Sequence, residues 1–175
     1  MSARRHSEIS EAVSSADYAD AADLIRCYVT WCRQRYSAHP SLVDAAFSYQ
    51  GLDAELASLR RSYDRPTGAM LLARVGGQAA GCAAFRTIGP RISEMKRLFV
   101  KPEHHGLGVG RRLCTRLMEI ATSRGFLTMR LDSGDLLTEA RALYKSLGFV
   151  DIEPYYDCPA DLRKHLVFME RALAS

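Results

Sequence analysis

The 175-residue sequence lacks several features that define whole classes of protein. Its five cysteines are an odd number and contain no Cys-x-x-Cys pair, which speaks against a disulfide framework and favours a reducing compartment. No apolar run is long enough to span a bilayer, and none follows the first arginines as a signal peptide requires. Basic residues are scattered, with a formal net charge of only +4. We therefore expect a cytoplasmic protein with neither a membrane nor a nucleic-acid partner.

Several catalytic signatures are also missing. The sequence has no Gly-x-Ser-x-Gly elbow for a serine nucleophile. His104 and His105 are adjacent, but no further ligand follows at a spacing typical of a metal site, so we expect no metal. Cys114 lies inside a predicted helix with no His near it in the sequence, which leaves a covalent cysteine route unsupported.

The composition is that of an ordinary globular protein, with 47% hydrophobic and 25% charged residues, and a chain of this length usually forms one domain. Residues 6–13 alternate weakly and predict an edge strand. A helix begins near Asp17, with Ser14 and Asp17 spaced as a capping box. Its Tyr28 and Trp31 are expected in the core. Ser41 and Asp44 are again spaced as a cap, and a further helix is predicted over 51–63.

The middle of the chain predicts an antiparallel meander. Strands are expected over 69–75, 78–88 and 91–100, the first two joined by a tight turn at Gly76-Gly77. After a glycine-rich turn, a helix is predicted to run to about residue 124 and to stop at Gly125. The rest predicts a strand over 126–131, a helix over 136–147 capped by Asp135, and strands over 149–152 and 165–170.

The glycine-rich turn between the third meander strand and its helix is the most informative stretch. Gly106, Gly108 and Gly110 lack Cβ atoms, so the turn can adopt positive φ and a ligand can approach the backbone. The first N–H groups of the helix and its dipole favour a phosphate or pyrophosphate there. A Walker loop is excluded because Arg111 and Arg112 follow the last glycine. A dinucleotide fingerprint needs Gly-x-Gly-x-x-Gly, and the preceding meander also disfavours it.

A third interpretation of the glycine-rich turn comes from its resemblance to the sequence signature of a known protein family. His105-Gly-Leu-Gly-Val-Gly110 resembles the Gln/Arg-x-x-Gly-x-Gly/Ala signature of the GNAT superfamily of N-acetyltransferases, in which the turn holds the pyrophosphate of coenzyme A. Leu98-Phe-Val-Lys-Pro102 looks like the family's strand before that turn, and Ala142-Leu-Tyr-Lys-Ser-Leu-Gly-Phe149 looks like its tyrosine-bearing helix and following strand. His105 stands where the family usually has Arg or Gln.

The resemblance implies a mixed α/β fold in a single domain over residues 1–175. The central, twisted, mostly antiparallel sheet should have six to seven strands, splay after the fourth and be flanked by about four helices. Residues 15–65 should form the acceptor wall and residues 66–152 the acetyl-CoA-binding core. The last strands should be exposed edges of the sheet, and pairing of these edges between two subunits would form a homodimer.

The resemblance also implies an activity: transfer of the acetyl group of acetyl-CoA to a primary amine by direct attack. Tyr144 should be the general acid that protonates the departing thiolate, and Glu94 the base that takes the amine proton, directly or through water. For Glu94, a surface carboxylate paired with Lys96 or Arg97 is an equal alternative. The acceptor is a small-molecule amine or a protein amino group.

The remaining site residues follow from the same resemblance. Backbone N–H groups from Leu98 to Val100 should stabilise the oxyanion. Tyr36, Phe47, Tyr49 and Asp132 are expected to contact the acceptor. The residues expected to bind the cofactor are Leu98, Phe99, Val100, His105, Gly106, Leu107, Gly108, Val109, Gly110, Arg111 and Lys145. Two other functions remain as alternatives: a non-catalytic coenzyme A-binding regulatory domain and a dinucleotide-dependent oxidoreductase.

Overall fold

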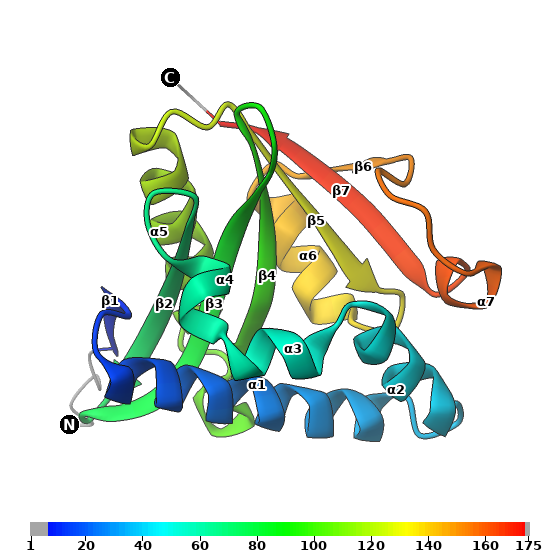
Figure 1. Cartoon of the computed structure of the whole chain (residues 1–175). Helices are drawn as coiled ribbons and strands as arrows, with labels where there is room; N and C mark the ends of the chain where they lie inside the picture. Colours follow the sequence, from blue (N-terminus) through cyan, green and yellow to red (C-terminus); the bar gives the residue numbers. More distant parts are fainter. Residues whose placement is uncertain (1–6, 174–175) are drawn as a thin grey trace.

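A seven-stranded sheet with helices on both faces forms the fold in the computed structural model, which describes residues 7–173 (Figure 1). The strands lie in the order β1-β2-β3-β4-β5-β7-β6. Their bounds are β1 (Ser7–Glu11), β2 (Gly68–Val75), β3 (Gln78–Gly89), β4 (Ile92–Val100), β5 (Thr128–Gly134), β6 (Val150–Ile152) and β7 (Leu166–Ala172). The helices are α1 (Ser15–Arg35), α2 (Pro40–Tyr49), α3 (Leu52–Ala57), α4 (Leu59–Tyr63), α5 (Val109–Ser123), α6 (Thr138–Ser146) and α7 (Ala160–Arg163), with one 3₁₀ turn (Pro102–His104).

The predicted meander is confirmed, because β2, β3 and β4 pair antiparallel in sequence order. Gly76 and Gly77 make the β2–β3 turn with φ values of 58° and 81°, which side chains disfavour. The strand expected over residues 6–13 is β1, an edge strand paired with β2; residue 6 lies outside the described residues. The Ser14–Asp17 capping box is present, and it fixes the start of α1.

Two apolar cores lie on opposite faces of the sheet. On one face, α5 presents Leu113, Leu117 and Ala121 to the apolar side chains of β2, β3 and β5. On the other face, α1 packs Leu24 and Ile25 against the sheet, together with the short helices α3 and α4. The alternation of side chains along the strands therefore supplies both cores, and the middle strands are covered on each side.

The sheet opens between β4 and β5. These two strands pair in parallel over only three positions, Ile92–Glu94 against Thr128–Arg130. Beyond them the strands separate, with α6 behind the opening (Figure 1). The splay predicted after the fourth strand is thus confirmed, and it leaves the second half of β4 without a neighbour on that side.

A bulge in β4 lies at the start of the opening. Cys82 opposes Phe99 and Ala84 opposes Lys96, so Arg97 and Leu98 together face one residue of β3. Arg97 has a φ of 59°, a left-handed value that is uncommon for a residue other than glycine.

The side chain of Arg97 is held by a buried ion pair. Its Nε and Nη2 donate to the two oxygens of Glu55 at 2.9 and 2.7 Å, and both side chains are less than a tenth exposed. Tyr63 donates to the same carboxylate at 2.7 Å, and Gln50 accepts from Nη1 at 2.9 Å. Burial opposes ionisation of Glu55, but the hydrogen bonds and charge of Arg97 outweigh it, so its pKa is lowered. The helices after α1 are in this way tied to the bulge.

Several expectations about local structure were wrong. The helix predicted over 51–63 is two helices that meet at Ser58, which has a φ of −139°. α2 begins at Pro40 without a side-chain cap, so Ser41 and Asp44 do not form one. Asp135 does not cap the helix after it, because its carboxylate accepts from Tyr36 and lies against His165. Tertiary partners compete successfully with these local hydrogen bonds.

The end of the chain also differs from expectation. β7 enters the sheet between β5 and β6, so β6 is an edge strand and β7 is not. β5 extends to Gly134, which places Asp132 inside the strand instead of at its end. There is a single parallel pair, so the mostly parallel sheet of a dinucleotide-binding fold is absent from residues 7–173.

Three further observations concern the described part of the chain. All five cysteines are free thiols. Across residues 7–173, no helix is both long and apolar enough to cross a membrane. The same residues contain no cluster of three or more His, Cys, Asp or Glu side chains arranged to hold a metal ion.

The Arg97–Glu55 pair generates a stability prediction. We expect Glu55→Ala to lower the free energy of unfolding by about 3 to 5 kcal/mol, because it leaves a buried guanidinium without its counter-charge. Urea denaturation measures this change. Glu119→Ala, which removes the exposed partner of Arg116, is the matched control and should change stability by less than about 0.5 kcal/mol. Equal effects of the two substitutions would show that the buried pair contributes nothing special.

Candidate active site

A cavity of about 600 Å³ lies where β4 and β5 separate. Its walls come from α1 and α2 on one side, α6 on the other, and the splayed strands β4 and β5 between them; α7 and the start of β7 add Leu162, His165 and Leu166. The glycine-rich turn and the start of α5 close one end. Segments that are far apart in the sequence therefore converge on a single site.

The glycine-rich turn has the geometry of an anion site. Gly106 and Gly108 have φ values of 76° and 74°, and a Cβ added to either would meet no atom within 4 Å. Gly110, for which positive φ was also expected, instead belongs to α5, and its Cβ would lie 3.4 Å from Leu143. No side chain caps the start of α5, so the first N–H groups of the helix are free to bind an anion.

His105 fastens the turn to the strand before it. Its Nε2 lies 2.8 Å from the carbonyl oxygen of Val100. Because a carbonyl only accepts, Nε2 carries the proton in this contact. The residue that departs from the family signature thus acts within the turn, where it joins the end of β4 to the glycines.

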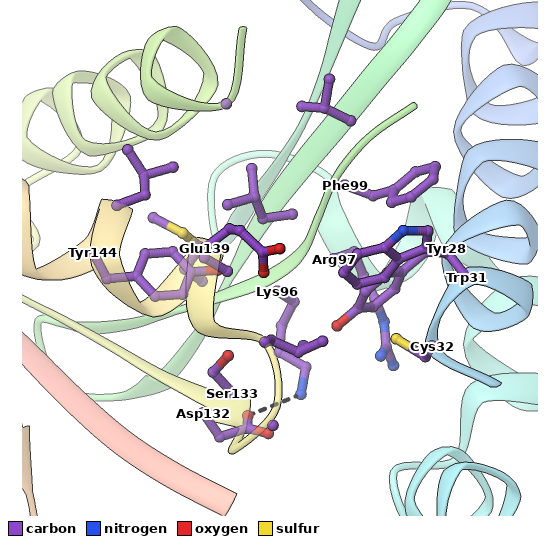
Figure 2. Close-up of a pocket in the computed structure, with 18 of the residues that line it drawn as sticks. Tyr28, Trp31, Cys32, Lys96, Arg97, Phe99, Asp132, Ser133, Glu139 and Tyr144 are labelled. Atoms are coloured by element: carbon purple, nitrogen blue, oxygen red, sulfur yellow. Dashed lines mark hydrogen bonds and ion pairs between the residues drawn. The ribbon is translucent and has the colours of Figure 1, made fainter. Parts of the chain in front are cut away.

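Tyr144 lines the cavity from α6. Its ring packs 5.8 Å from that of Phe149, and its hydroxyl makes no hydrogen bond within residues 7–173. Figure 2 shows the ring on the wall opposite Tyr28, Trp31 and Phe99. Burial raises the pKa of Tyr144 well above its ordinary value, and nearby Cys114 and Asp132 raise it further. The phenol therefore stays protonated at neutral pH and can donate.

An ion pair spans the floor of the cavity. Lys96 on β4 and Asp132 on β5 approach to 3.5 Å, and each side chain is only 7% exposed (Figure 2). Ser133 lies beside Asp132. This pair crosses the gap between the splayed strands, beyond the last backbone hydrogen bonds that join them.

The cavity wall on the side of α1 and α2 is aromatic. Tyr28 packs against Phe47 and Phe99 with ring centroids 5.8 and 5.7 Å apart, and Trp31 lies 6.5 Å from Phe99. Tyr36 follows at the end of α1, where its hydroxyl donates to Asp135 at 2.8 Å. A Cβ on Gly134 would collide with that hydroxyl, so the glycine permits this contact.

The structure brings together most of the site residues named from the sequence. The following line the cavity: Tyr36, Phe47, Leu98, Phe99, Val100, His105, Gly106, Gly108, Val109, Gly110, Arg111, Asp132 and Tyr144. Leu107 is exposed outside it, and Lys145 is exposed and paired with Asp151 at 3.3 Å. Tyr49 is also exposed, with its hydroxyl donating to the carbonyl oxygen of Asp157.

Glu94 is not a cavity residue. Its side chain is 2% exposed, and it accepts from Arg86 Nε and from the hydroxyl of Tyr155, each at 2.8 Å. The alternative role, an exposed carboxylate paired with Lys96 or Arg97, is wrong, since the carboxylate is buried and is bonded to Arg86 and Tyr155.

Several cavity residues were missed or misjudged from the sequence. Tyr28 and Trp31 were expected only as core residues, yet they also line the cavity. Lys96 and Arg97 were considered only as surface partners, whereas both are buried and line the cavity. The one available signal was two adjacent basic residues inside an apolar strand, because charged side chains are rarely buried without a partner.

Comparison of the sequence with known proteins identifies its family. Residues 24–149 match the model of the Acetyltransferase (GNAT) family. An uncharacterized N-acetyltransferase of Schizosaccharomyces pombe is 44% identical over 114 residues, which are 64% of this chain and 70% of that protein. An IAA acetyltransferase of Azospirillum brasilense is 35% identical over 114 residues, 62% of this chain and 71% of that protein.

Solved structures agree on the fold. The PaiA N-acetyltransferase of Thermoplasma acidophilum, determined in complex with coenzyme A, has a TM-score of 0.68 and 20% identity, and the match covers 95% of this chain and 99% of that one. An acyl-CoA N-acyltransferase from Klebsiella pneumoniae, described as putative, has a TM-score of 0.73 and 24% identity, over 97% and 99% of the two chains. The sequence match and the splayed sheet lead to one conclusion: this chain belongs to the GNAT family and is an acetyltransferase enzyme.

Proposed function

We propose that the protein transfers the acetyl group of acetyl-CoA to a primary amine inside the cavity between β4 and β5. The observation that carries the proposal is the convergence of an uncapped helix start, a protonated tyrosine and an ion pair on one cavity. An anion site alone would suit many nucleotides. The tyrosine and the cavity beside it are what acyl transfer requires in addition.

The residues present fit coenzyme A. The turn His105–Gly110 offers free N–H groups and a helix dipole for the pyrophosphate, and Arg111 lines the same end of the cavity. The separated strands leave an opening beside Leu98–Val100, where backbone donors can face an acyl carbonyl. Acetyl-CoA supplies an acetyl group activated as a thioester.

The acid–base steps follow from the transfer itself. The C–N bond forms as the C–S bond breaks; the acceptor ammonium gives up two protons and the thiolate takes one, so one proton is released overall. We propose Tyr144 as the donor to the thiolate, because it lines the cavity and its raised pKa keeps the phenol protonated at neutral pH. Tyr144 is neutral before the step and regains its proton from solvent afterwards.

For the base we retain Glu94, restricted to a route through water. Its carboxylate is buried, bonded to Arg86 and Tyr155, and does not line the cavity, so it does not contact an amine held there. A chain of water and the Tyr155 hydroxyl can still carry a proton to it.

The anion site is tested by glycine substitution with calorimetric binding of acetyl-CoA. We expect Gly108→Glu to weaken binding by about a hundredfold, because it adds strain and sets a carboxylate against phosphate. Gly76→Glu is the matched control: it has a similar φ of 58°, equally open surroundings, and a place in the β2–β3 turn far along the chain. Equal loss in both variants, or NAD binding more tightly than acetyl-CoA, would overturn the assignment of the turn.

The general acid is tested by Tyr144→Phe. We expect kcat to fall about a hundredfold, on the scale of general acid catalysis, while the affinity for acetyl-CoA stays nearly unchanged. Thiol release during steady-state turnover measures kcat. Tyr18→Phe, at a buried tyrosine of the opposite core, is the control and should retain full activity. An unchanged kcat in Tyr144→Phe would rule out this role.

The base is tested separately by Glu94→Gln. The substitution keeps the shape of the side chain and removes its capacity to take a proton, so we expect kcat to fall about a hundredfold with little change in KM for acetyl-CoA. The unfolding midpoint of the variant provides the stability control. A normal kcat in Glu94→Gln would show that Glu94 is only a structural partner of Arg86 and Tyr155.

A wild-type protein that binds acetyl-CoA but acetylates no amine would instead support the alternative function, a non-catalytic coenzyme A-binding domain.

A further inference from the structure

The ion pair on the cavity floor does not fit the expected pattern of a structural salt bridge. The side chains of Lys96 and Asp132 are each 7% exposed, yet Lys96 Nζ lies 3.5 Å from Asp132 Oδ1. A strong charge-assisted hydrogen bond is shorter, roughly 2.7 to 2.9 Å between the two atoms. Lys96 Nζ makes no other hydrogen bond to the side chains and backbone of residues 7–173. Each group therefore keeps unused hydrogen-bonding capacity, and both line the cavity.

The other charged groups around the cavity are either already paired or, like Arg111, lie at the end with the glycine-rich turn. Arg97 is held bidentately by Glu55. Glu139, at the α6 side, accepts from Arg35 of α1 at 2.8 Å. The charges still available to a ligand deep in the cavity are thus one ammonium and one carboxylate, side by side.

From this arrangement we infer that the acceptor is a zwitterion, an α-amino acid with an apolar or aromatic side chain. Its ammonium binds Asp132 and its carboxylate binds Lys96. This inference rests on the proposed function and names the substrate class of the same site.

Charge balance favours a zwitterion over a simple amine. An amine without a carboxylate would bring a second cation to Asp132, and two ammonium groups would then share one buried carboxylate. An α-amino acid brings one charge of each sign, so the four groups form a ring of alternating charge. The amino terminus of a peptide does not bring one charge of each sign. Its carbonyl group belongs to a neutral amide, so it gives Lys96 no additional counter-charge.

The spacing also fits an α-amino acid. With N–Cα and Cα–C bonds of about 1.5 Å meeting at about 111°, the nitrogen lies about 2.5 Å from the carboxyl carbon and about 3 Å from the midpoint of the two carboxylate oxygens, where the negative charge is centred. Lys96 Nζ and Asp132 Oδ1 are separated by 3.5 Å, so both charges of the ligand can be met at once.

The walls above the pair indicate what the rest of the acceptor looks like. Tyr28, Trp31 and Phe99 line one side of the cavity (Figure 2), and the ring of Phe47 packs 5.8 Å from that of Tyr28. Such a surface binds an apolar side chain by area burial and a ring by edge or offset contacts. A polyamine or an amino sugar would need several free carboxylates or many hydrogen-bonding partners, and this wall offers neither.

The test compares three acceptors that share one side chain: L-phenylalanine, L-phenylalanine amide and phenethylamine. The wild-type protein is assayed with acetyl-CoA, and kcat/KM is measured for each. We expect L-phenylalanine to exceed the other two by at least about tenfold, the scale of a hydrogen bond between charged groups. Equal or better turnover of phenethylamine or of the amide would overturn the inference.

A substitution at the ion pair sharpens the result. Lys96→Met removes the cation while keeping an unbranched side chain, and the ratio of kcat/KM for L-phenylalanine over phenethylamine should fall about tenfold. Lys164→Met removes an exposed lysine that pairs with Asp161 and should leave the ratio unchanged. If Lys96→Met does not fold, the wild-type comparison still decides.

The outcomes separate this inference from the proposed function. Acetylation of amines that lack a carboxylate, with apolar amino acids no better, would retain the acetyltransferase and reject the zwitterion. Failure to acetylate any apolar amino acid, in protein that binds acetyl-CoA, would also reject the zwitterion. Failure to bind acetyl-CoA at all would reject the proposed function itself.

Discussion

The brief pairing of β4 with β5 is the constraint on which the rest of the site depends. Parallel hydrogen bonds join the two strands at three positions and then stop, although both strands continue. Every feature of the candidate active site borders the opening that results. The turn lies after the end of β4, Tyr144 stands on the helix behind the opening, and the Lys96–Asp132 pair crosses it. A fully paired sheet would leave no cavity there.

The opening carries an energetic cost that side chains offset. The bulge at Arg97 needs a left-handed backbone conformation, and the bidentate bond to Glu55 fixes the residue in it. On the same strand, the buried carboxylate of Glu94 is held by Arg86 of β3 and by the hydroxyl of Tyr155. β4 is thus an unusual strand, since Glu94, Lys96 and Arg97 lie buried within four residues and each has a charged partner. These partners hold the strand in shape where backbone pairing is missing.

The two faces of the opening have different chemistry. The end near the glycine-rich turn offers backbone N–H groups and suits a phosphate-bearing ligand. The side near α1 and α2 offers aromatic rings and a single pair of opposite charges. Tyr144 faces the region between them. In a group transfer the donor and acceptor must meet at one point, and this arrangement lets them approach from different sides of the sheet.

The sequence by itself determined the elements whose signals are local. Hydrogen bonding and φ preferences within a few residues explain the capping box at Ser14, the glycine turn at Gly76-Gly77 and the meander. The same local preferences explain the glycine-rich turn of Gly106 and Gly108 and the helix after it. Only the tertiary structure decided which charges are buried together. Glu55 with Arg97 and Lys96 with Asp132 are separated by 42 and 36 positions, and no local pattern pairs them. The same reason explains why Glu94 does not line the cavity itself and why Asp135 became a partner of Tyr36. A side chain's partner is set by packing, which becomes visible only when the strands and helices are in place.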